Sequence, residues 1–284
     1  MKLATIRSTA TPSGHFAAVL VGEEAVQLPG FADVGEFLAA DVTAQQQAVE
    51  AARAANSDGS LIRVPEAGAD FAPVVPNPSK VICVGLNYHD HIKETGNEVP
   101  SHPTLFAKFA DTLAGANDDI EIPEEDHRID WEAELVIVIG SGGRRLTEEQ
   151  AEDAIAGYTV ANDVSMRGYQ GRTIEWLQGK VWDASTPVGP YVATKDEVAP
   201  NARIYTTVNG ETVQDDTIDT QVFSPAQLVA YISVATTLRP GDLILTGTPA
   251  GVALGRRNDQ GRHPWLVAGD VLETGIEGIG SQRN

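Results

Sequence analysis

The chain has 284 residues, of which 42% are hydrophobic, and it carries 40 Asp and Glu residues against 20 Lys and Arg residues, a formal net charge of −20. This length and composition predict a globular protein with a substantial core. The negative charge argues against nucleic acid and membranes as partners, because both present anionic surfaces. An anionic substrate would therefore require a site that is locally positive.

The N-terminus lacks the apolar segment of a secretory signal, and no stretch approaches the roughly 18 consecutive apolar residues of a membrane-spanning helix. The single cysteine, Cys83, excludes an intrachain disulfide. It lies in the apolar segment VICVG, which favours a buried structural thiol over a nucleophile. These features are typical of a cytoplasmic protein.

The first 75 residues predict a small N-terminal α+β domain. Residues 33–55 favour helix, with an interruption in the middle. Residues 66–80 contain several prolines and no clear period, which indicates an extended connector. Short apolar segments between turn residues predict strands at residues 3–7, 15–22 and 25–29. We therefore place a boundary near residue 75, with a second domain at 76–284.

The second domain is predicted to be rich in short strands. Asn209-Gly210 supplies the positive φ angles of a type I′ turn, so residues 203–214 predict a hairpin. Further apolar segments predict buried strands at residues 80–87, 134–143 and 242–252. Because only a few helices interrupt these strands, we expect a β-rich α+β fold rather than a doubly wound one.

Two helices carry recognisable start signals. Thr147 and Gln150 form a capping box at the start of one helix, and Gly157 is a plausible residue for its C-terminal end. Ser224 and Gln227 form a second capping box.

Two glutamates, Glu132 and Glu134, open the apolar segment DWEAELVIVIG. On a strand, residues two apart share a face, so the two carboxylates project side by side. The first alternative is a solvated face of an edge strand. The second is a hard divalent cation that relieves their mutual repulsion, since such ions prefer carboxylate oxygens. The pair alone leaves both alternatives open.

Asp163 offers a third carboxylate, because it follows the apolar segment YTVA at a strand end. Taken alone, the Asn-Asp pair there is more typical of a turn.

Five motifs follow one another in the second domain: GLNYHDHIKE, DWEAELVIVIG, ANDVSMR, LQGKVWDASTPVGP and GDLILTGTPAGV. In their order and spacing the chain resembles the fumarylacetoacetate hydrolase family over residues 78–284. The resemblance implies a mixed β-roll or barrel, a homodimer, and a small extra N-terminal domain.

The resemblance implies that Glu132, Glu134 and Asp163 bind Mg²⁺, or Mn²⁺ or Ca²⁺ in some members. The chain departs from the animal enzymes at Asn87, where those place a fourth carboxylate. Water or substrate would fill that position, which suits a metal that must bind a chelating substrate.

His91 and Glu94 are spaced i,i+3, so one helical turn places them on one face. The resemblance implies that they form a pair that activates water; His89 does not match the motif and is expected at the surface. The polar segment 95–104 is either a lid over the substrate or an ordinary exposed loop.

Lys180 matches a lysine that polarises a substrate oxygen, and Lys108 matches a family lysine of less certain role. The resemblance further implies substrate contacts by Arg167, Gln170, Thr248 and Tyr88. Taken alone, Arg167, Gln170 and Lys180 would be expected to face solvent, and the segment around Thr248 would be expected to form a tight turn.

We therefore expect a divalent-metal-dependent hydrolase of aromatic compound catabolism, which cleaves a C–C bond in an acylpyruvate or related 1,3-diketo acid of the fumarylpyruvate type. Its substrate would be a small anionic α-keto acid, cleaved through a metal-stabilised pyruvate enolate. The alternatives are an oxaloacetate-type decarboxylase, a 2-hydroxyhepta-2,4-diene-1,7-dioate isomerase, and a non-catalytic metal or ligand binder.

Overall fold

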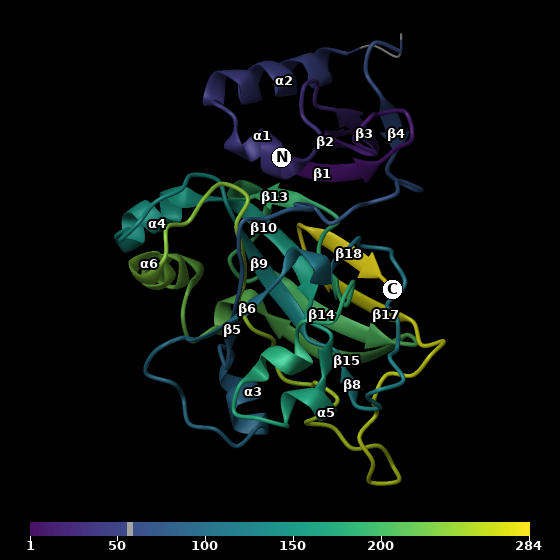
Figure 1. The fold of residues 1–284 in the computed structure, drawn as a ribbon, viewed down its shortest axis with the longest axis vertical. Coiled ribbons are helices and arrows are strands. Elements are labelled where there is room, and N and C mark those ends of the chain that lie inside the picture. Colours follow the sequence, from purple (N-terminus) through teal and green to yellow (C-terminus); the bar gives the residue numbers. More distant parts are fainter. Residues whose placement is uncertain (56–58) are drawn as a thin grey trace.

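The computed structural model describes residues 1–55 and 59–284, and most of its regular structure is strand (Figure 1). The strands are β1 (Lys2–Arg7), β2 (His15–Val21), β3 (Glu24–Gln27), β4 (Arg63–Pro65), β5 (Val81–Gly85), β6 (Thr104–Lys108), β7 (Leu113–Ala114), β8 (Ile129–Asp130), β9 (Ala133–Ile139), β10 (Ile155–Asn162), β11 (Ser165–Met166), β12 (Thr186–Pro187), β13 (Val192–Thr194), β14 (Arg203–Val208), β15 (Glu211–Thr217), β16 (Leu243–Leu245), β17 (Leu272–Ile276) and β18 (Gly280–Arg283). The helices are α1 (Val34–Ala39), α2 (Val42–Ala54), α3 (His89–Glu94), α4 (Glu148–Ala154), α5 (Arg167–Gln170) and α6 (Pro225–Ala235).

A ten-stranded sheet runs through the whole molecule in the order β4-β3-β2-β1-β13-β10-β9-β16-β5-β6. The N-terminal strands join it because β1 pairs antiparallel with β13, where Leu3 lies opposite Val192. Helices α1 and α2 cover the N-terminal strands at one end of the molecule (Figure 1). The N-terminal segment is thus attached through backbone hydrogen bonds as well as through side-chain packing.

Strand β9 lies at the centre of the fold and is buried along its whole length. One of its faces packs on the four-stranded sheet β15-β14-β17-β18, where Leu135 meets Ile204 and Ile276. Further along the same face, Ile137 packs with Leu228 under α4 and α6. The other face carries Val136 and Val138, which pack in the main core with Val81 and Leu243. Burial on both faces explains why β9 reads as a continuous apolar run. The solvated edge strand considered for this segment is therefore excluded.

The predicted β-rich α+β class is confirmed. In the part of the chain that the structure describes, the strand pairings form open sheets, so the family's roll or barrel stays a prediction. None of the described helices is both long and apolar enough to cross a membrane.

Most local signals predicted their elements correctly. Both capping boxes form, at Thr147 for α4 and at Ser224 for α6. The hairpin β14–β15 turns at Asn209 and Gly210, both with positive φ. Cys83 is buried, as expected of a structural thiol.

Gly157 does not end a helix, and this prediction was wrong. Helix α4 ends at Ala154 and the chain passes directly into β10, where the register shifts at Gly157. A Cβ at Gly157 would lie 2.1 Å from the carbonyl oxygen of Ala193 on the neighbouring strand. Glycine is required there because two backbones approach closely.

Replacing Gly157 with alanine should lower the free energy of unfolding by about 1–3 kcal/mol, the usual range for an overpacked core position. The matched control is Gly171→Ala, whose Cβ would meet its nearest neighbour at 3.4 Å, an ordinary contact. Chemical denaturation of both variants measures the difference. Equal destabilisation by the two substitutions would contradict the packing argument.

Candidate active site

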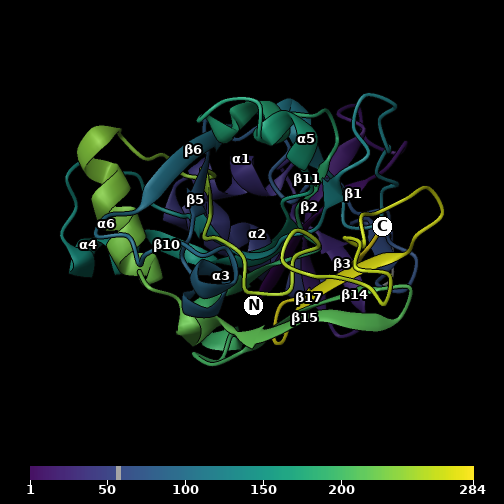
Figure 2. The same cartoon turned by 90° about the horizontal axis from the view of Figure 1, so that it is seen from below.

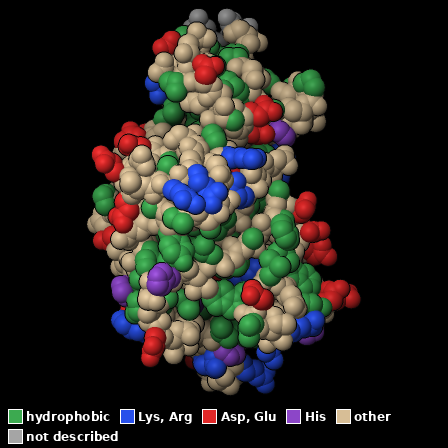
Figure 3. Space-filling model, turned by 60° about the vertical axis from the view of Figure 1, so that its left-hand side comes forward, with side chains coloured by type: hydrophobic (Ala, Val, Ile, Leu, Met, Phe, Trp, Pro, Cys, Tyr) green, Lys and Arg blue, Asp and Glu red, His purple; other side chains and the backbone are tan. Residues whose placement is uncertain are grey.

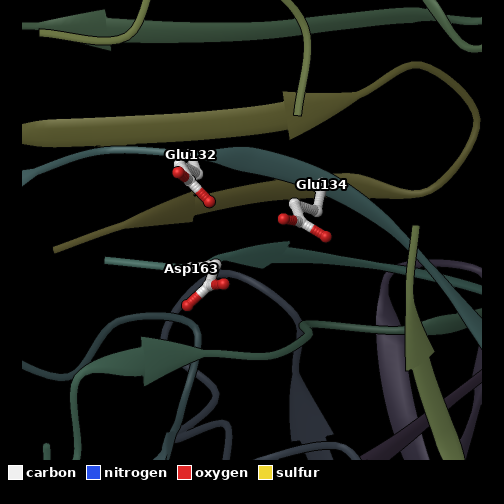
Figure 4. Close-up of side chains that lie close together, drawn as sticks. All are labelled: Glu132, Glu134 and Asp163. Carbon is white, nitrogen blue, oxygen red and sulfur yellow. The ribbon is translucent and has the colours of Figure 1, made fainter. Parts of the chain in front are cut away.

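Three carboxylates meet where β9 begins and β10 ends. The antiparallel pairing of these strands places Ala133 opposite Asn162, and Asp163 donates its N–H to the carbonyl of Glu132 at 2.8 Å. Glu132, Glu134 and Asp163 are all buried, and each offers an oxygen within 4.8 Å of the other two. Figure 4 shows the three side chains close together. The two glutamates share a face, as the strand period predicts.

Buried cations compensate two of these carboxylates. The ammonium of Lys180 lies 2.6 Å from Glu132 and 2.9 Å from Asp163, and Lys108 lies 2.5 Å from Asp163. Arg167 donates to Glu132 at 2.6 Å. Burial alone would raise the pKa of Glu132, but the charges of Lys180 and Arg167 outweigh it and lower the pKa to about 2.

Glu134 differs because it has no ion-pair partner among the described residues. Its carboxylate accepts one hydrogen bond, from the N–H of Gly247 at 2.8 Å. Burial, together with repulsion from Asp163 and Glu132, raises the pKa of Glu134 well above its ordinary value. A buried carboxylate that lacks a cation, beside two others, fits a hard divalent ion such as Mg²⁺, Mn²⁺ or Ca²⁺.

His91 and Glu94 form a hydrogen-bonded pair on α3, with 3.1 Å between Nδ1 and Oε2. Glu94 also accepts the N–H of Gly251 at 3.0 Å. A Cβ at Gly255 would lie 2.2 Å from the Glu94 carboxyl, so the loop after β16 packs directly on it. The i,i+3 spacing has produced the pair that it predicts.

One cavity of about 960 Å³ contains most of the predicted site residues. Its lining includes Glu132 and Glu134 of the carboxylate cluster and His91 of the pair. Seen from below, the loop after β16 runs between α3 and α5 (Figure 2). The predicted residues that also line the cavity are Arg167, Gln170, Lys180 and Thr248.

The predicted residues Glu94 and Asp163 lie behind His91 and Glu132 and are not among those that line this cavity, and neither are Tyr88 and Lys108. Tyr88 is fully buried, and its hydroxyl accepts a hydrogen bond from Gln221 at 3.2 Å. Asn87 is held by the carbonyls of Thr246 and Phe223. The substrate contact predicted for Tyr88 stays a prediction.

Asp130 was not singled out from the sequence, although it begins the DWE motif. It is fully buried and accepts from Arg167 at 2.8 Å. It also accepts the N–H groups of Ala253 and Leu254, at 2.6 Å and 3.1 Å. Asp130 thus joins the carboxylate cluster, through Arg167, to the loop that holds Glu94.

Sequence comparisons identify the family of the chain. The model for the C-terminal domain of fumarylacetoacetate hydrolase matches residues 80–284. Mitochondrial oxaloacetate tautomerase of Xenopus laevis is 44% identical over 218 residues, which cover 75% of this chain and 67% of that protein. The 2,4-didehydro-3-deoxy-L-rhamnonate hydrolase of a Sphingomonas strain is 37% identical over 267 residues, 92% of this chain and 93% of the other.

Solved structures resemble the whole chain, including its N-terminal segment. The 2-hydroxyhepta-2,4-diene-1,7-dioate isomerase of Mycobacterium marinum superposes with a TM-score of 0.77 at 32% identity, covering 100% of this chain and 97% of that one. Maleylpyruvate hydrolase of Sphingobium sp. SYK-6 gives 0.79 at 28% identity, covering 100% and 98%. On the match to the family model and these relatives, the chain belongs to the fumarylacetoacetate hydrolase family.

Proposed function

We propose that this protein is a divalent-metal-dependent hydrolase that cleaves a C–C bond in an acylpyruvate or a related 1,3-diketo acid of the fumarylpyruvate type. The observation that carries the proposal is that His91, paired with Glu94, and the buried glutamates of the cluster line one cavity. Hydrolysis needs both a base for water and a positive centre for the departing enolate. Similarity to a hydrolase along nearly the full length of both chains supports this reaction class.

Glu132, Glu134 and Asp163 would hold the ion. When bound, a divalent ion supplies a Lewis acid that polarises the 2-oxo group of the substrate. The ammonium group of the fully buried Lys180 donates hydrogen bonds to Glu132 and Asp163, which leaves one of its N–H groups for a substrate oxygen. Arg167 is largely occupied by Asp130, Glu132 and Gln170, so it orients these groups.

His91 takes a proton from water, while Glu94 holds the imidazole in place through Nδ1. The water oxygen then adds to the distal carbonyl carbon of the substrate. Collapse of this adduct breaks the bond between that carbon and C3 of the pyruvate unit. The distal carbonyl fragment becomes a carboxylic acid, and protonation of the other fragment at C3 gives pyruvate.

The second candidate is keto–enol tautomerisation of oxaloacetate. The 44% identity to a named oxaloacetate tautomerase favours it. This reaction moves a proton at the same C3 carbon but needs no attacking water. Decarboxylation of oxaloacetate and isomerisation of an unsaturated dioic acid use the same enolate, and remain further outcomes of the same site.

We also propose that the protein forms a homodimer. Strand β6 is an edge of the large sheet, and Leu105 on it and Phe109 just after it are 38% and 55% exposed. A second copy would cover this apolar surface.

Replacing Glu134 with glutamine should abolish activity without loss of stability, because Glu134 has no cation to leave unpaired. Activity should fall at least about 100-fold, as for a damaged metal site. Glu132→Gln should instead cost about 3–5 kcal/mol of stability, since it leaves the buried Lys180 short of a partner. Thermal unfolding with and without Mg²⁺ measures the stability of both variants, and pyruvate release from fumarylpyruvate measures their activity.

The decisive readout is the rise in melting temperature that Mg²⁺ produces in the wild-type protein. Glu134→Gln should remove most of this rise. An undiminished rise in Glu134→Gln would exclude Glu134 as a ligand.

The metal-free protein should lose stability as the pH rises. The pKa of Glu134 is raised in the folded state, so the folded protein holds a proton that the unfolded chain has released. The free energy of unfolding therefore falls as the pH climbs from the ordinary glutamate range through the raised pKa. Denaturation in EDTA from about pH 5 to about pH 8 measures the fall.

Glu134→Gln should lack this component of the pH dependence. The effect of Glu132 on the pH dependence of stability has the opposite sign. Its pKa is lowered to about 2, so the stability that its ionised form contributes is lost only as the pH falls toward that value. A pH profile of Glu134→Gln that matches the wild type would contradict the assignment.

Replacing His91 with alanine should separate the two candidate reactions. Hydrolysis of fumarylpyruvate should fall by about 100-fold or more, because the base for water is lost. Glu94→Gln, which keeps the size of the side chain, should cause a smaller loss in the same assay. Enolisation of oxaloacetate needs no attacking water and should be much less affected.

Pyruvate release and the enol absorbance of oxaloacetate provide the two assays. If wild-type protein tautomerises oxaloacetate but hydrolyses neither fumarylpyruvate nor acetylpyruvate, the second candidate replaces the first.

A further inference from the structure

The charges around the cavity are the reverse of those of the whole chain. The chain has twice as many Asp and Glu as Lys and Arg. In the described part of the chain, the acidic residues that line the cavity are Glu132 and Glu134, both of the carboxylate cluster. Its lysine and arginine residues are Arg128, Arg167, Lys180 and Arg262.

These four cations fall into two groups. Arg167 and Lys180 are buried, and their charges are committed to carboxylates of the site. Arg128 and Arg262 are exposed, and neither guanidinium has an ion-pair partner within residues 1–55 and 59–284. In a chain so rich in carboxylates, two arginines without partners on one cavity are available for a ligand.

The backbones of both arginines are held in place. Arg128 donates its N–H to Asp126 at 2.9 Å, and its carbonyl accepts the N–H of Arg167 at 2.9 Å. Arg262 donates to the side chain of Asn258 at 2.9 Å.

The two segments are joined to each other, because Leu266 donates to the carbonyl of Ile129 at 2.9 Å. Next to Arg262, the ring of His263 stacks on Trp265 with 4.7 Å between centroids. Figure 3 shows Lys, Arg and His side chains gathered with hydrophobic ones at the lower end of the molecule.

We propose that Arg128 and Arg262 form an outer anion subsite that binds a carboxylate at the far end of the substrate. The inference rests on the proposed function, which places the 2-oxo acid group at the carboxylate cluster. The site then selects 2-oxo dicarboxylates over 2-oxo monocarboxylates of equal length. Arginine suits this role because its planar guanidinium pairs with a carboxylate through two hydrogen bonds.

Binding is tested first, because it does not depend on turnover. Calorimetry in the presence of Mg²⁺ compares 2-oxoglutarate with 2-oxopentanoate, which has the same chain length but no second carboxylate. The wild-type protein should bind 2-oxoglutarate about 10-fold more tightly, the effect of one accessible charge-assisted pair. Arg128→Gln and Arg262→Gln should each weaken this preference, and the double variant should abolish it.

Arg53→Gln is the matched control, since Arg53 is an exposed arginine on α2 outside this cavity. It changes the net charge by the same amount and should keep the full preference. The subsite would be overturned if the wild-type protein bound both acids equally or bound neither. It would also be overturned if the preference for 2-oxoglutarate survived in the double variant.

Turnover separates this inference from the proposed function. In the double variant, kcat/KM should fall about 10-fold or more for fumarylpyruvate and stay nearly unchanged for acetylpyruvate, which has no distal carboxylate. A wild-type protein that prefers 2-oxoglutarate but hydrolyses neither substrate would retain the subsite and refute the hydrolase. Hydrolysis that is equally impaired for both substrates would refute the subsite and retain the hydrolase.

Discussion

A buried series of ion pairs, with alternating positive and negative side chains, holds the site together. It runs from Asp130 through Arg167 to Glu132, and from there through Lys180 and Asp163 to Lys108, with each contact between 2.5 and 2.9 Å. Each carboxylate in this series faces at least one cation, and this attraction offsets the free energy of removing the carboxylate from water. Glu134 stands beside this series without an ion-pair partner among the described residues. With Glu134 ionised, the cluster would carry four carboxylates against three cations, and this imbalance, together with burial, is why the pKa of Glu134 is raised.

The loop that follows β16 organises both halves of the site through its backbone. Its N–H groups bind Glu134 at Gly247, Glu94 at Gly251, and Asp130 at Ala253 and Leu254. This one segment thereby fixes a carboxylate of the cluster, the partner of His91, and the residue that orients Arg167. Because β16 pairs with β9, the loop leaves the sheet next to the glutamates that it holds. The spatial relation between the carboxylate cluster and the His91–Glu94 pair thus depends on strand pairing.

Local patterns could be predicted from the sequence, whereas partners distant along the chain could not. The strand period placed Glu132 and Glu134 on one face, and helical spacing joined His91 to Glu94. The ion pair of Asp130 with Arg167 spans 37 residues and arises only when β8 and β11 come together. Gly157 was misread for the same reason, since the strand that excludes a side chain there comes from residue 193. The family resemblance selected the third carboxylate, Asp163, for which the local pattern alone favoured a turn.

The charge balance also bears on how a strongly acidic protein would bind the anion proposed as its substrate. The cations at the inner end of the cavity are paired with carboxylates of the protein, so ionisation of Glu134 would add an uncompensated negative charge there. Under the proposed function, a divalent ion would supply the positive charge that Glu134 and a 2-oxo acid both need at this end, and would be part of the binding site rather than an accessory to it. At the outer end the situation is reversed, because Arg128 and Arg262 have no carboxylate partner among the described residues. In the proposed arrangement, fixed positive charge at the mouth of the cavity would attract the substrate first, and the metal-loaded cluster would retain it at the base.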